Sequence, residues 1–266
     1  MNYIQISGGL GNQMFQYTFG KYAEVVTGQP TILFTEFFDN DKGSTLSTPR
    51  SFSLDKFKTN YIRVNGHIQY NNTICEGKDE INPHDDNCLI KGYWQDKYYF
   101  HKVKDKVLHE FQLKDENFSD KTNDITDNMR KCESVSIHIR RTDYLSPLHI
   151  NGFVILDEEY YKKAVNILID KLGYKPILYI FSDDYDYIST RMRDFCGCKT
   201  NIVHTGFDYE DMCIMASAKH HIIANSTFSW WSAMLSTSPN RINIGPQKWF
   251  KTIPEHDIYE DDWITI

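Results

Sequence analysis

The sequence lacks the features that define several large protein classes. No apolar run approaches the roughly 18 residues of a membrane-spanning helix, and the N-terminus has no basic then apolar layout of a signal peptide. Acidic residues outnumber basic ones by 36 to 29, and the net charge of −7 argues against nucleic-acid binding through diffuse electrostatics. No tandem repeat or low-complexity segment is present. These absences favour a cytoplasmic protein, at most peripheral at the inner face of a membrane.

Metal-binding patterns are also scarce. The six cysteines are scattered, and Cys196-Gly197-Cys198 has no second pair at zinc-site spacing, so we interpret the cysteines as reduced thiols. Asp184-Tyr185-Asp186 formally fits the Asp-x-Asp of metal-dependent sugar transferases. A three-letter pattern in an acidic stretch is weak evidence, and we expect neither a metal ion nor a cofactor.

Strand and helix patterns alternate through most of the 266 residues, which predicts mostly parallel sheets with helices on both faces. The stretch 39–87 is expected to be loops with short strands. The polar stretch 114–131 is the best candidate connection, so we predict an N-terminal half, 1–125, and a C-terminal half, 126–266, facing a cleft. Predicted strands are 3–6, 31–34, 89–94, 135–139, 177–181, 201–203, 221–224 and 242–244. Predicted helices are 12–26, 97–111, 157–172, 185–195, 209–219 and 228–235.

A glycine-rich segment, Ser7-Gly8-Gly9-Leu10-Gly11-Asn12-Gln13, separates the first predicted strand from the first predicted helix. Glycines let a backbone approach a ligand closely, and a helix N-terminus favours an anion or a hydroxyl-rich ligand. Met14 stands where the dinucleotide pattern has its third glycine, and no Lys-Ser/Thr follows, which excludes a P-loop. The segment is therefore either a ligand contact or simply a tight turn.

Basic side chains end the predicted strand 135–139. His138 and Arg140 alternate with isoleucines, so they leave the strand on one side, at the C-terminal end where open α/β sheets bind ligands. Guanidinium groups match phosphate with paired, charge-assisted hydrogen bonds. A small anionic ligand is the prediction, although Arg141 could instead form an ion pair with Asp143.

Two further predicted strands also end in polar groups. Asp183 and Asp184 follow strand 177–181, where one carboxylate could accept from a ligand such as a guanine edge and the other could cap the next helix. Asn225-Ser226-Thr227-Phe228 opens helix 228–235, whose N–H groups could hold a phosphate, while Trp230 and Trp231 are expected in the core. Together the three strand ends suit a nucleotide diphosphate.

Five segments, taken jointly and in order, resemble the α-1,2-fucosyltransferases of glycosyltransferase family 11 over nearly the whole chain. They are Gly8-Gly9-Leu10-Gly11-Asn12-Gln13-Met14-Phe15-Gln16-Tyr17, Gly92-Tyr93-Trp94-Gln95, His138-Ile139-Arg140-Arg141-Thr142-Asp143-Tyr144, Phe181-Ser182-Asp183-Asp184 and Ala224-Asn225-Ser226-Thr227-Phe228-Ser229-Trp230-Trp231. Thr227 departs mildly from the serine usual there. The chain is also somewhat short for the family, which leaves the acceptor open.

The resemblance implies a GT-B-like α/β fold of two Rossmann-like halves, GDP-β-L-fucose as donor, inversion at the anomeric carbon and no metal. It implies transfer of L-fucose to the 2-hydroxyl of a terminal galactose on an oligosaccharide or lipid-linked glycan. Arg140 would contact the donor pyrophosphate and act in catalysis. The implied donor-binding set is His138, Arg140, Arg141, Asp183, Asp184, Asn225, Ser226, Thr227 and Phe228. The implied donor and acceptor loop contains Gly9, Gly11, Asn12 and Gln13.

The sequence leaves several alternatives open. The enzyme could be another GDP-fucose-dependent transferase, with α-1,6 linkage or a different acceptor, or the chain could be a non-catalytic nucleotide- or glycan-binding protein. Asp143 and His138 are both candidates for a catalytic base, although His138 is already assigned to the nucleotide.

Overall fold

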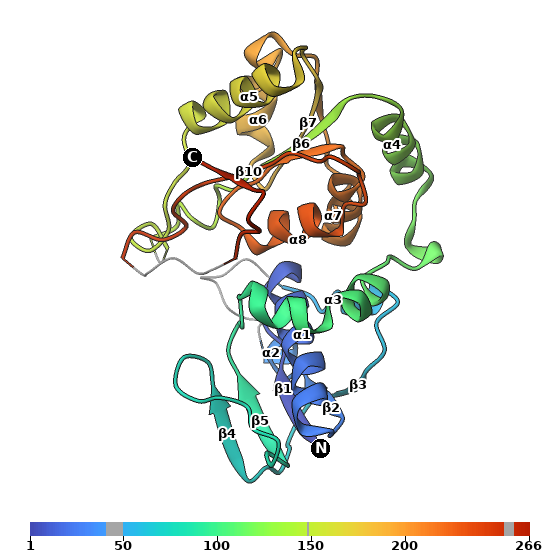
Figure 1. The fold of residues 1–266 in the computed structure, drawn as a ribbon, viewed down its shortest axis with the longest axis vertical. Coiled ribbons are helices and arrows are strands. Elements are labelled where there is room, and N and C mark those ends of the chain that lie inside the picture. The colour runs from blue at the N-terminus through green and yellow to red at the C-terminus, as the bar shows by residue number, and fades with distance from the viewer. Residues whose placement is uncertain (41–49, 148, 253–257) are drawn as a thin grey trace. The chain divides into compact units, whose positions relative to one another are not determined.

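The computed structural model describes residues 1–40, 50–147, 149–252 and 258–266. The chain forms two compact units, one over Met1–Lys114 with Ile258 and the other over Asp115–Glu255 and Tyr259–Ile266 (Figure 1). Each unit is built on its own parallel β-sheet with helices packed on it. The predicted fold class, two Rossmann-like halves, is therefore confirmed. Part of the predicted irregular stretch, 41–49, lies outside the described residues.

The first unit contains a five-stranded sheet in the order β3-β2-β1-β5-β4, and every strand pair in it is parallel. Its strands are β1 (Asn2–Gln5), β2 (Thr31–Phe34), β3 (Ile62–Val64), β4 (Asn72–Cys75) and β5 (Cys88–Lys91). Its helices are α1 (Leu10–Thr27), α2 (Phe37–Asn40) and α3 (Lys97–Glu110), with a 3₁₀ turn at Leu54–Lys56. The elements β1, β2, α1 and α3 lie within a few residues of their predicted ranges, and β3 and β4 are short strands within the stretch 39–87. The predicted strand 89–94 is shorter, because the chain turns at Gly92.

Helix α1 lies against the sheet because its inner side is apolar and one position is small. Met14, Phe15 and Phe19 are buried. A Cβ on Gly20 would lie 3.3 Å from the side chains of Ile4 and Thr31, so the glycine allows close approach to β1 and β2. The helix ends at Gly28, whose φ of +66° gives the left-handed C-cap that glycine adopts without strain.

The second unit contains a six-stranded parallel sheet in the order β11-β10-β9-β6-β7-β8. The chain starts at the central strand β6, adds β7 and β8 on one side, then returns to add β9, β10 and β11 on the other. This is the strand order of a dinucleotide-binding fold, which reverses between β6 and β9. The strands are β6 (Ser134–Ile139), β7 (Ile177–Ser182), β8 (Thr200–Ile202), β9 (His220–Ile222), β10 (Asn243–Gly245) and β11 (Ile264–Thr265).

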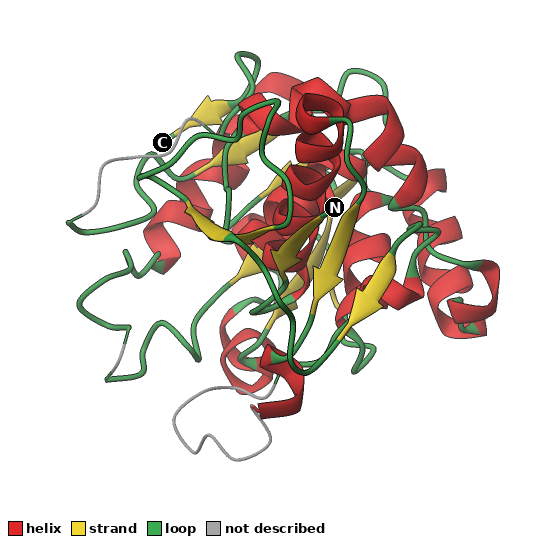
Figure 2. Cartoon of the chain, turned by 90° about the horizontal axis from the view of Figure 1, so that it is seen from below, coloured by secondary structure: helices red, strands yellow, loops and turns green. Residues whose placement is uncertain are grey.

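Helices cover both faces of this second sheet. Alternate residues of β6, including Val135 and Ile137, pack on α5, while Tyr179 and Phe181 of β7 pack on α7. Figure 1 shows α5 and α8 on opposite sides of β6 and β10, and Figure 2 shows helices packed over strands. Trp230 and Trp231 are fully buried, as predicted. The helices are α4 (Asp120–Lys131), α5 (Glu158–Leu172), α6 (Tyr185–Arg191), α7 (Asp208–Ala216) and α8 (Thr227–Leu235), with 3₁₀ turns at Asp115–Asn117 and Phe195–Gly197.

Most of the stretch 114–131, predicted as the boundary or connection between the halves, forms helix α4, which was not predicted. Contacts divide the chain at Lys114, the first residue of this stretch. The helix escaped detection because its buried face consists of Thr122, Thr126 and Met129, which give little hydrophobic signal. Helix α6 is also shorter than predicted, and β11 was not predicted.

A buried carboxylate holds the start of α4. Glu210 of α7, 5% exposed, accepts a hydrogen bond from the Thr122 hydroxyl at 2.8 Å and from the Ser119 backbone N–H and hydroxyl, each at 3.3 Å. Ser119 is the N-cap of α4 and accepts from the Thr122 N–H. Loss of this carboxylate would leave the buried Thr122 hydroxyl without its acceptor, while the exposed Ser119 donors could bond water.

We predict that Glu210→Ala lowers the free energy of unfolding by about 1–3 kcal/mol, the cost of leaving one buried donor, the Thr122 hydroxyl, unsatisfied. Urea denaturation monitored by circular dichroism measures the change. Glu159→Ala is the control, since its side chain on α5 is 79% exposed. Equal stability of the two variants would contradict this role for Glu210.

Candidate functional site

The nine donor-site candidates of the second unit lie at or just after the carboxyl ends of three strands, and hydrogen bonds and ion pairs connect these strand ends. His138, Arg140 and Arg141 lie at the end of β6, Asp183 and Asp184 follow β7, and the segment 225–228 follows β9. The ends of β6 and β9 flank the point where the strand order reverses, which is where ligands bind in open α/β sheets. The four loop candidates, Gly9 to Gln13, belong to the first unit.

Two carboxylates hold the Arg140 guanidinium. Its Nη1 lies 3.2 Å from Asp183 Oδ2, and its Nη2 forms a hydrogen-bonded ion pair with Asp143 Oδ2. The three side chains are 16–18% exposed, so solvent screens the group only partly. The Tyr144 ring lies beside the guanidinium, 5.8 Å from ring centroid to Cζ. Arg140 is therefore oriented before any ligand arrives.

Asp183 also organises the backbone after β6. Its carboxylate accepts from the N–H groups of Arg141 at 2.9 Å and Thr142 at 3.2 Å, and from the Thr142 hydroxyl. The sequence predicted a ligand-facing carboxylate at this strand end. In this structure the Asp183 carboxylate is occupied by protein donors, so its visible role is to shape the turn that presents Arg140.

Asp184 caps the next helix, as one residue of the pair was expected to do. Its Oδ1 accepts from the Tyr187 N–H at 3.0 Å, and its Oδ2 lies 3.1 Å from Arg141 Nε. The Arg141 guanidinium also lies over the Tyr187 ring, 3.8 Å from its centroid. The alternative pairing of Arg141 with Asp143 was wrong, because the turn puts Asp143, three residues on, beside Arg140.

The turn between β9 and α8 is tied to the arginine cluster through Tyr144. The Tyr144 hydroxyl donates to the Asn225 carbonyl at 2.6 Å, and the Asn225 amide donates to the carbonyls of Val154 and Trp249, both at 2.9 Å. Ser226 is the N-cap of α8 but its side chain forms no capping hydrogen bond. The first-turn N–H groups of α8 are thus not capped by that hydroxyl, and such groups favour an anion.

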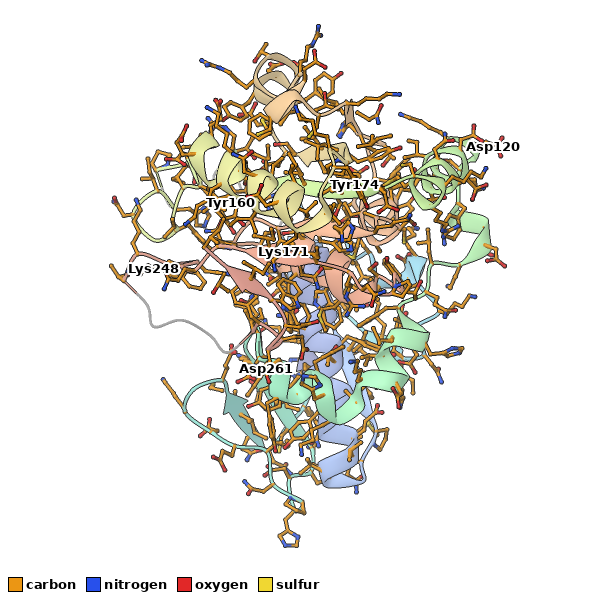
Figure 3. All side chains as sticks on the ribbon, turned by 45° about the horizontal axis from the view of Figure 1, so that its top comes forward. Asp120, Tyr160, Lys171, Tyr174, Lys248 and Asp261 are labelled. Atoms are coloured by element: carbon orange, nitrogen blue, oxygen red, sulfur yellow. The ribbon has the colours of Figure 1, made fainter. Side chains whose placement is uncertain are left out.

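Two tyrosines of helix α5 donate hydrogen bonds to the backbone near the ends of β6 and β9. Tyr160 (labelled in Figure 3) donates to the Ile223 carbonyl at 2.7 Å, just after β9. Tyr161 donates to the His138 carbonyl at 3.2 Å, within β6. Burial raises the pKa of both phenols, so both stay protonated donors at neutral pH.

His138 is enclosed between the sheet and α8. The residue is 4% exposed, and its ring lies 5.4 Å from the Phe228 ring, centroid to centroid. Burial, reinforced by the positive charge of Arg140, lowers the pKa of His138 to about 3, so the imidazole is neutral at pH 7. Its Nδ1 is buried and has no hydrogen-bond partner among the described residues. This atom is the polar group of the site that a ligand could satisfy.

In the first unit, Gln13 has a different place from the one predicted. It is fully buried, and its amide bonds the Gly8 and Ser51 carbonyls and the Ser53 N–H at 2.8–3.1 Å. Gln13 therefore holds the loop in shape. The loop also needs Gly8, whose φ is +76° and where an added Cβ would lie 2.8 Å from the Asn12 amide.

The partners that position the site were the residues that sequence reasoning missed. Tyr144 gave no signal beyond its place in a family segment, and Asp143 was considered only as a partner for Arg141 or as a base. Gln16, likewise overlooked, is 1% exposed and bonds Ser7 and the Gly92 carbonyl. Spacing along the chain could have suggested the Arg140–Asp143 pair, since residues three apart meet in a helical turn.

Two Rossmann-like parallel sheets in one chain are the architecture of the GT-B-like fold, which this chain shares with known glycosyltransferases. The chain belongs to the family described as glycosyl transferase family 11, whose pattern matches residues 1–266. The resemblance stated from the sequence is thereby confirmed. Among the described residues, no helix is both long and apolar enough to cross a membrane.

Similar proteins agree with this assignment. The chain is 28% identical to the O-antigen biosynthesis glycosyltransferase WbnK of Escherichia coli, over 99% of this chain and all of that protein. It is 30% identical to an alpha-1,2-colitosyltransferase of Escherichia coli, over 98% of this chain and 97% of that protein. The fold resembles the fucosyltransferase NodZ of Bradyrhizobium, with a TM-score of 0.57 at 12% identity, over 91% of this chain and 94% of that one. The fold also resembles a family 9 glycosyl transferase of Veillonella parvula, with a TM-score of 0.50 at 9% identity, over 100% of this chain and 86% of that one.

The buried histidines make stability depend on pH. Burial lowers the pKa of His138 and His221 to about 3, from 6.5. The unfolded chain therefore binds more protons than the folded one between pH 6.5 and 3, and stability falls as pH decreases through that window. We predict a loss of up to about 1.4 kcal/mol per pH unit from each histidine, measured by urea unfolding at pH 7 and pH 5.

His221→Gln isolates one of these contributions. A glutamine can keep a hydrogen bond to Ser136, whose hydroxyl lies 2.8 Å from His221 Nδ1, but it does not titrate. The variant should have a shallower pH dependence than the wild type. His84→Gln, at an exposed position, is the matched control. If the free energy of unfolding of His221→Gln depends on pH as steeply as that of the wild type, the buried His221 does not contribute to the pH dependence and the prediction is wrong.

Proposed function

We propose that this protein is an inverting, metal-independent α-1,2-fucosyltransferase that moves L-fucose from GDP-β-L-fucose to the 2-hydroxyl of a terminal galactose on a glycan. The observation that carries the proposal is the oriented Arg140 guanidinium at the end of β6, at the strand-order switch point, next to Tyr144, whose hydroxyl bonds the Asn225 carbonyl ahead of α8. Membership of family 11 and a relative named for a 1,2-transfer support the reaction class.

The donor pyrophosphate would occupy the space between the end of β6 and the first turn of α8. Arg140 and Arg141 supply guanidinium N–H groups, and the segment Asn225–Phe228 supplies backbone N–H groups and hydroxyls. His138 Nδ1, buried without a partner among the described residues, would pair with the nucleoside. Asp183 and Asp184 would act by holding the two arginines. Gly9, Gly11 and Asn12 of the first unit are proposed contacts of donor and acceptor.

Catalysis would depend on stabilising the departing GDP. Transfer with inversion has an oxocarbenium-like transition state, in which negative charge builds on the leaving diphosphate. Arg140 and the α8 N–H groups are already oriented, so they meet that charge without reorganisation. The pKa of about 3 makes the His138 imidazole a poor base at neutral pH, which argues against its removing the acceptor proton.

The same contacts support catalysis without a metal. In the Asp184-Tyr185-Asp186 segment, one Asp184 oxygen accepts from Tyr187 N–H and the other pairs with Arg141. A metal ion would have to compete with these partners for the Asp184 carboxylate. The positive charge that a metal supplies in other transferases would come from Arg140 here.

Transfer of colitose is a second candidate, because the colitosyltransferase relative is 30% identical over nearly the whole chain. Colitose differs from fucose by lacking the 3-hydroxyl. A site that hydrogen-bonds this hydroxyl would reject colitose strongly, whereas a site without such contacts would accept both sugars.

The deciding experiment measures GDP release from GDP-fucose and GDP-colitose with lactose as acceptor, with and without EDTA. We expect turnover with GDP-fucose, unchanged by EDTA, and a product with a 1,2 linkage by NMR. Saturable nucleotide binding without GDP release would overturn the enzymatic proposal. Loss of activity in EDTA would restore the metal interpretation of Asp184 and Asp186, and a 1,6-linked product would replace the proposed linkage.

Arg140 provides the sharpest test of mechanism. Arg140→Ala should lose about 10³-fold in kcat, since one transition-state hydrogen-bond donor contributes about 3–4 kcal/mol. This variant also leaves Asp143 and Asp183 unpaired, so Arg140→Lys is needed to keep a positive charge between them.

Arg140→Lys should stay folded and still lose most of its turnover, because an ammonium cannot reproduce the planar fork of donors. Arg130→Ala, at an arginine 64% exposed on α4, is the control. Rates are compared at temperatures where circular dichroism shows each variant folded. Near wild-type turnover in folded Arg140 variants would exclude the proposed role.

A further inference from the structure

The segment Gly92-Tyr93-Trp94-Gln95 has no part in the proposed donor site. It follows β5, and the glycine-rich loop follows β1. These two strands are neighbours in the parallel sheet order β3-β2-β1-β5-β4, so both segments leave the same carboxyl edge. Gln95 Nε2 donates to Asn12 Oδ1 at 3.1 Å, and Gln16 Nε2 of α1 donates to the Gly92 carbonyl at 3.0 Å.

A carboxylate fixes the backbone of this segment. Glu76, just after β4, accepts from the N–H groups of Tyr93 and Trp94 with its two oxygens, each at 2.7 Å. Gly92 has a φ of +151°, and a Cβ there would lie 2.4 Å from the Glu76 Cβ. The carboxylate can take both N–H groups only because position 92 has no side chain.

The next residue adopts an unusual conformation. Trp94 has a φ of +56°, which is rare for a bulky side chain, yet it is only 2% exposed and stacks on Phe19 with centroids 3.7 Å apart. Backbone strain of this kind persists where the surrounding structure enforces it. The stacking and the Glu76 clamp enforce it here, and together they turn Trp94 inward and Tyr93 outward.

The result is an aromatic ring held outward on a fixed backbone. Tyr93 is 46% exposed, and it directly precedes the buried Trp94 and stands two residues before Gln95, whose amide bonds Asn12. An exposed aromatic face contacts the C–H face of a hexose, while amide side chains donate and accept for its hydroxyls.

We propose that Tyr93, with Gln95 and Asn12, forms a binding platform for the acceptor sugar, a galactose-class hexose stacked on the Tyr93 ring. This assignment rests on the proposed transfer to galactose. It gives Glu76 the part of a positioning residue, because Glu76 holds the backbone that carries the ring. The platform lies wholly within the first unit and needs no contact from the second.

The test compares three variants in steady-state transfer from GDP-fucose to lactose. Tyr93→Ala should raise KM for lactose about tenfold, equivalent to about 1.4 kcal/mol, with a much smaller change in KM for GDP-fucose. Tyr93→Phe keeps the ring and should stay near the wild-type KM. The matched control is Tyr70→Ala. Tyr70 is 41% exposed and precedes β4, so it lies at the amino edge of the sheet, whereas Tyr93 lies at the carboxyl edge.

The outcomes separate this inference from the proposed function. If the wild type transfers fucose and Tyr93→Ala has the lactose KM of Tyr70→Ala, the platform is excluded while the function stands. If the wild type releases no GDP, saturation-transfer NMR with lactose and methyl β-galactoside decides instead. Sugar binding that Tyr93→Ala abolishes and Tyr70→Ala retains supports the platform, and any other binding result overturns it.

Discussion

One carboxylate, that of Asp183, determines how the end of β6 is presented. It takes two successive backbone N–H groups and the Thr142 hydroxyl, and it pairs with Arg140. These bonds cross from β7 to β6, whose residues pair in register up to Ile139 and Ser182. The turn that follows brings Asp143 to the guanidinium and Tyr144 to the Asn225 carbonyl. The arginine, the second carboxylate and the start of α8 therefore all depend on how Asp183 bonds the backbone.

The sequence predicted the positions of the buried strands, because apolar runs bounded by polar residues mark them directly. The strands 31–34, 135–139 and 177–181 were found because their interiors are apolar, and their neighbours in space followed from the rules of parallel sheets. Helix α4 could not be found in this way, because threonines make most of its buried face. The partners of each aspartate could not be predicted either. Whether a carboxylate meets a ligand, a backbone N–H or an arginine depends on register and turn geometry.

Adjacent aromatic residues show the same limit. Trp230 and Trp231 are both buried, because α8 is enclosed by the rest of its unit. Tyr93 and Trp94 look equivalent in sequence, yet one is exposed and the other buried, since a positive φ at Trp94 separates their directions. Glutamines behave similarly: Gln13 and Gln16 stand in a segment suited to ligand contact, but both amides bond the protein. Side-chain type thus indicates which chemistry is available, and backbone conformation decides where it is used.

The charge balance of the Arg140 cluster has a consequence for how the protein meets an anion. Two guanidiniums, Arg140 and Arg141, face three carboxylates, Asp143, Asp183 and Asp184, so this group carries one net negative charge. The whole chain also has a net charge of −7. For the proposed nucleotide diphosphate ligand, this charge balance supplies little long-range attraction, so steering would add little to the encounter rate. Attraction would begin within hydrogen-bonding distance, where the guanidinium fork and the helix N–H groups would distinguish a correctly placed diphosphate from any other anion.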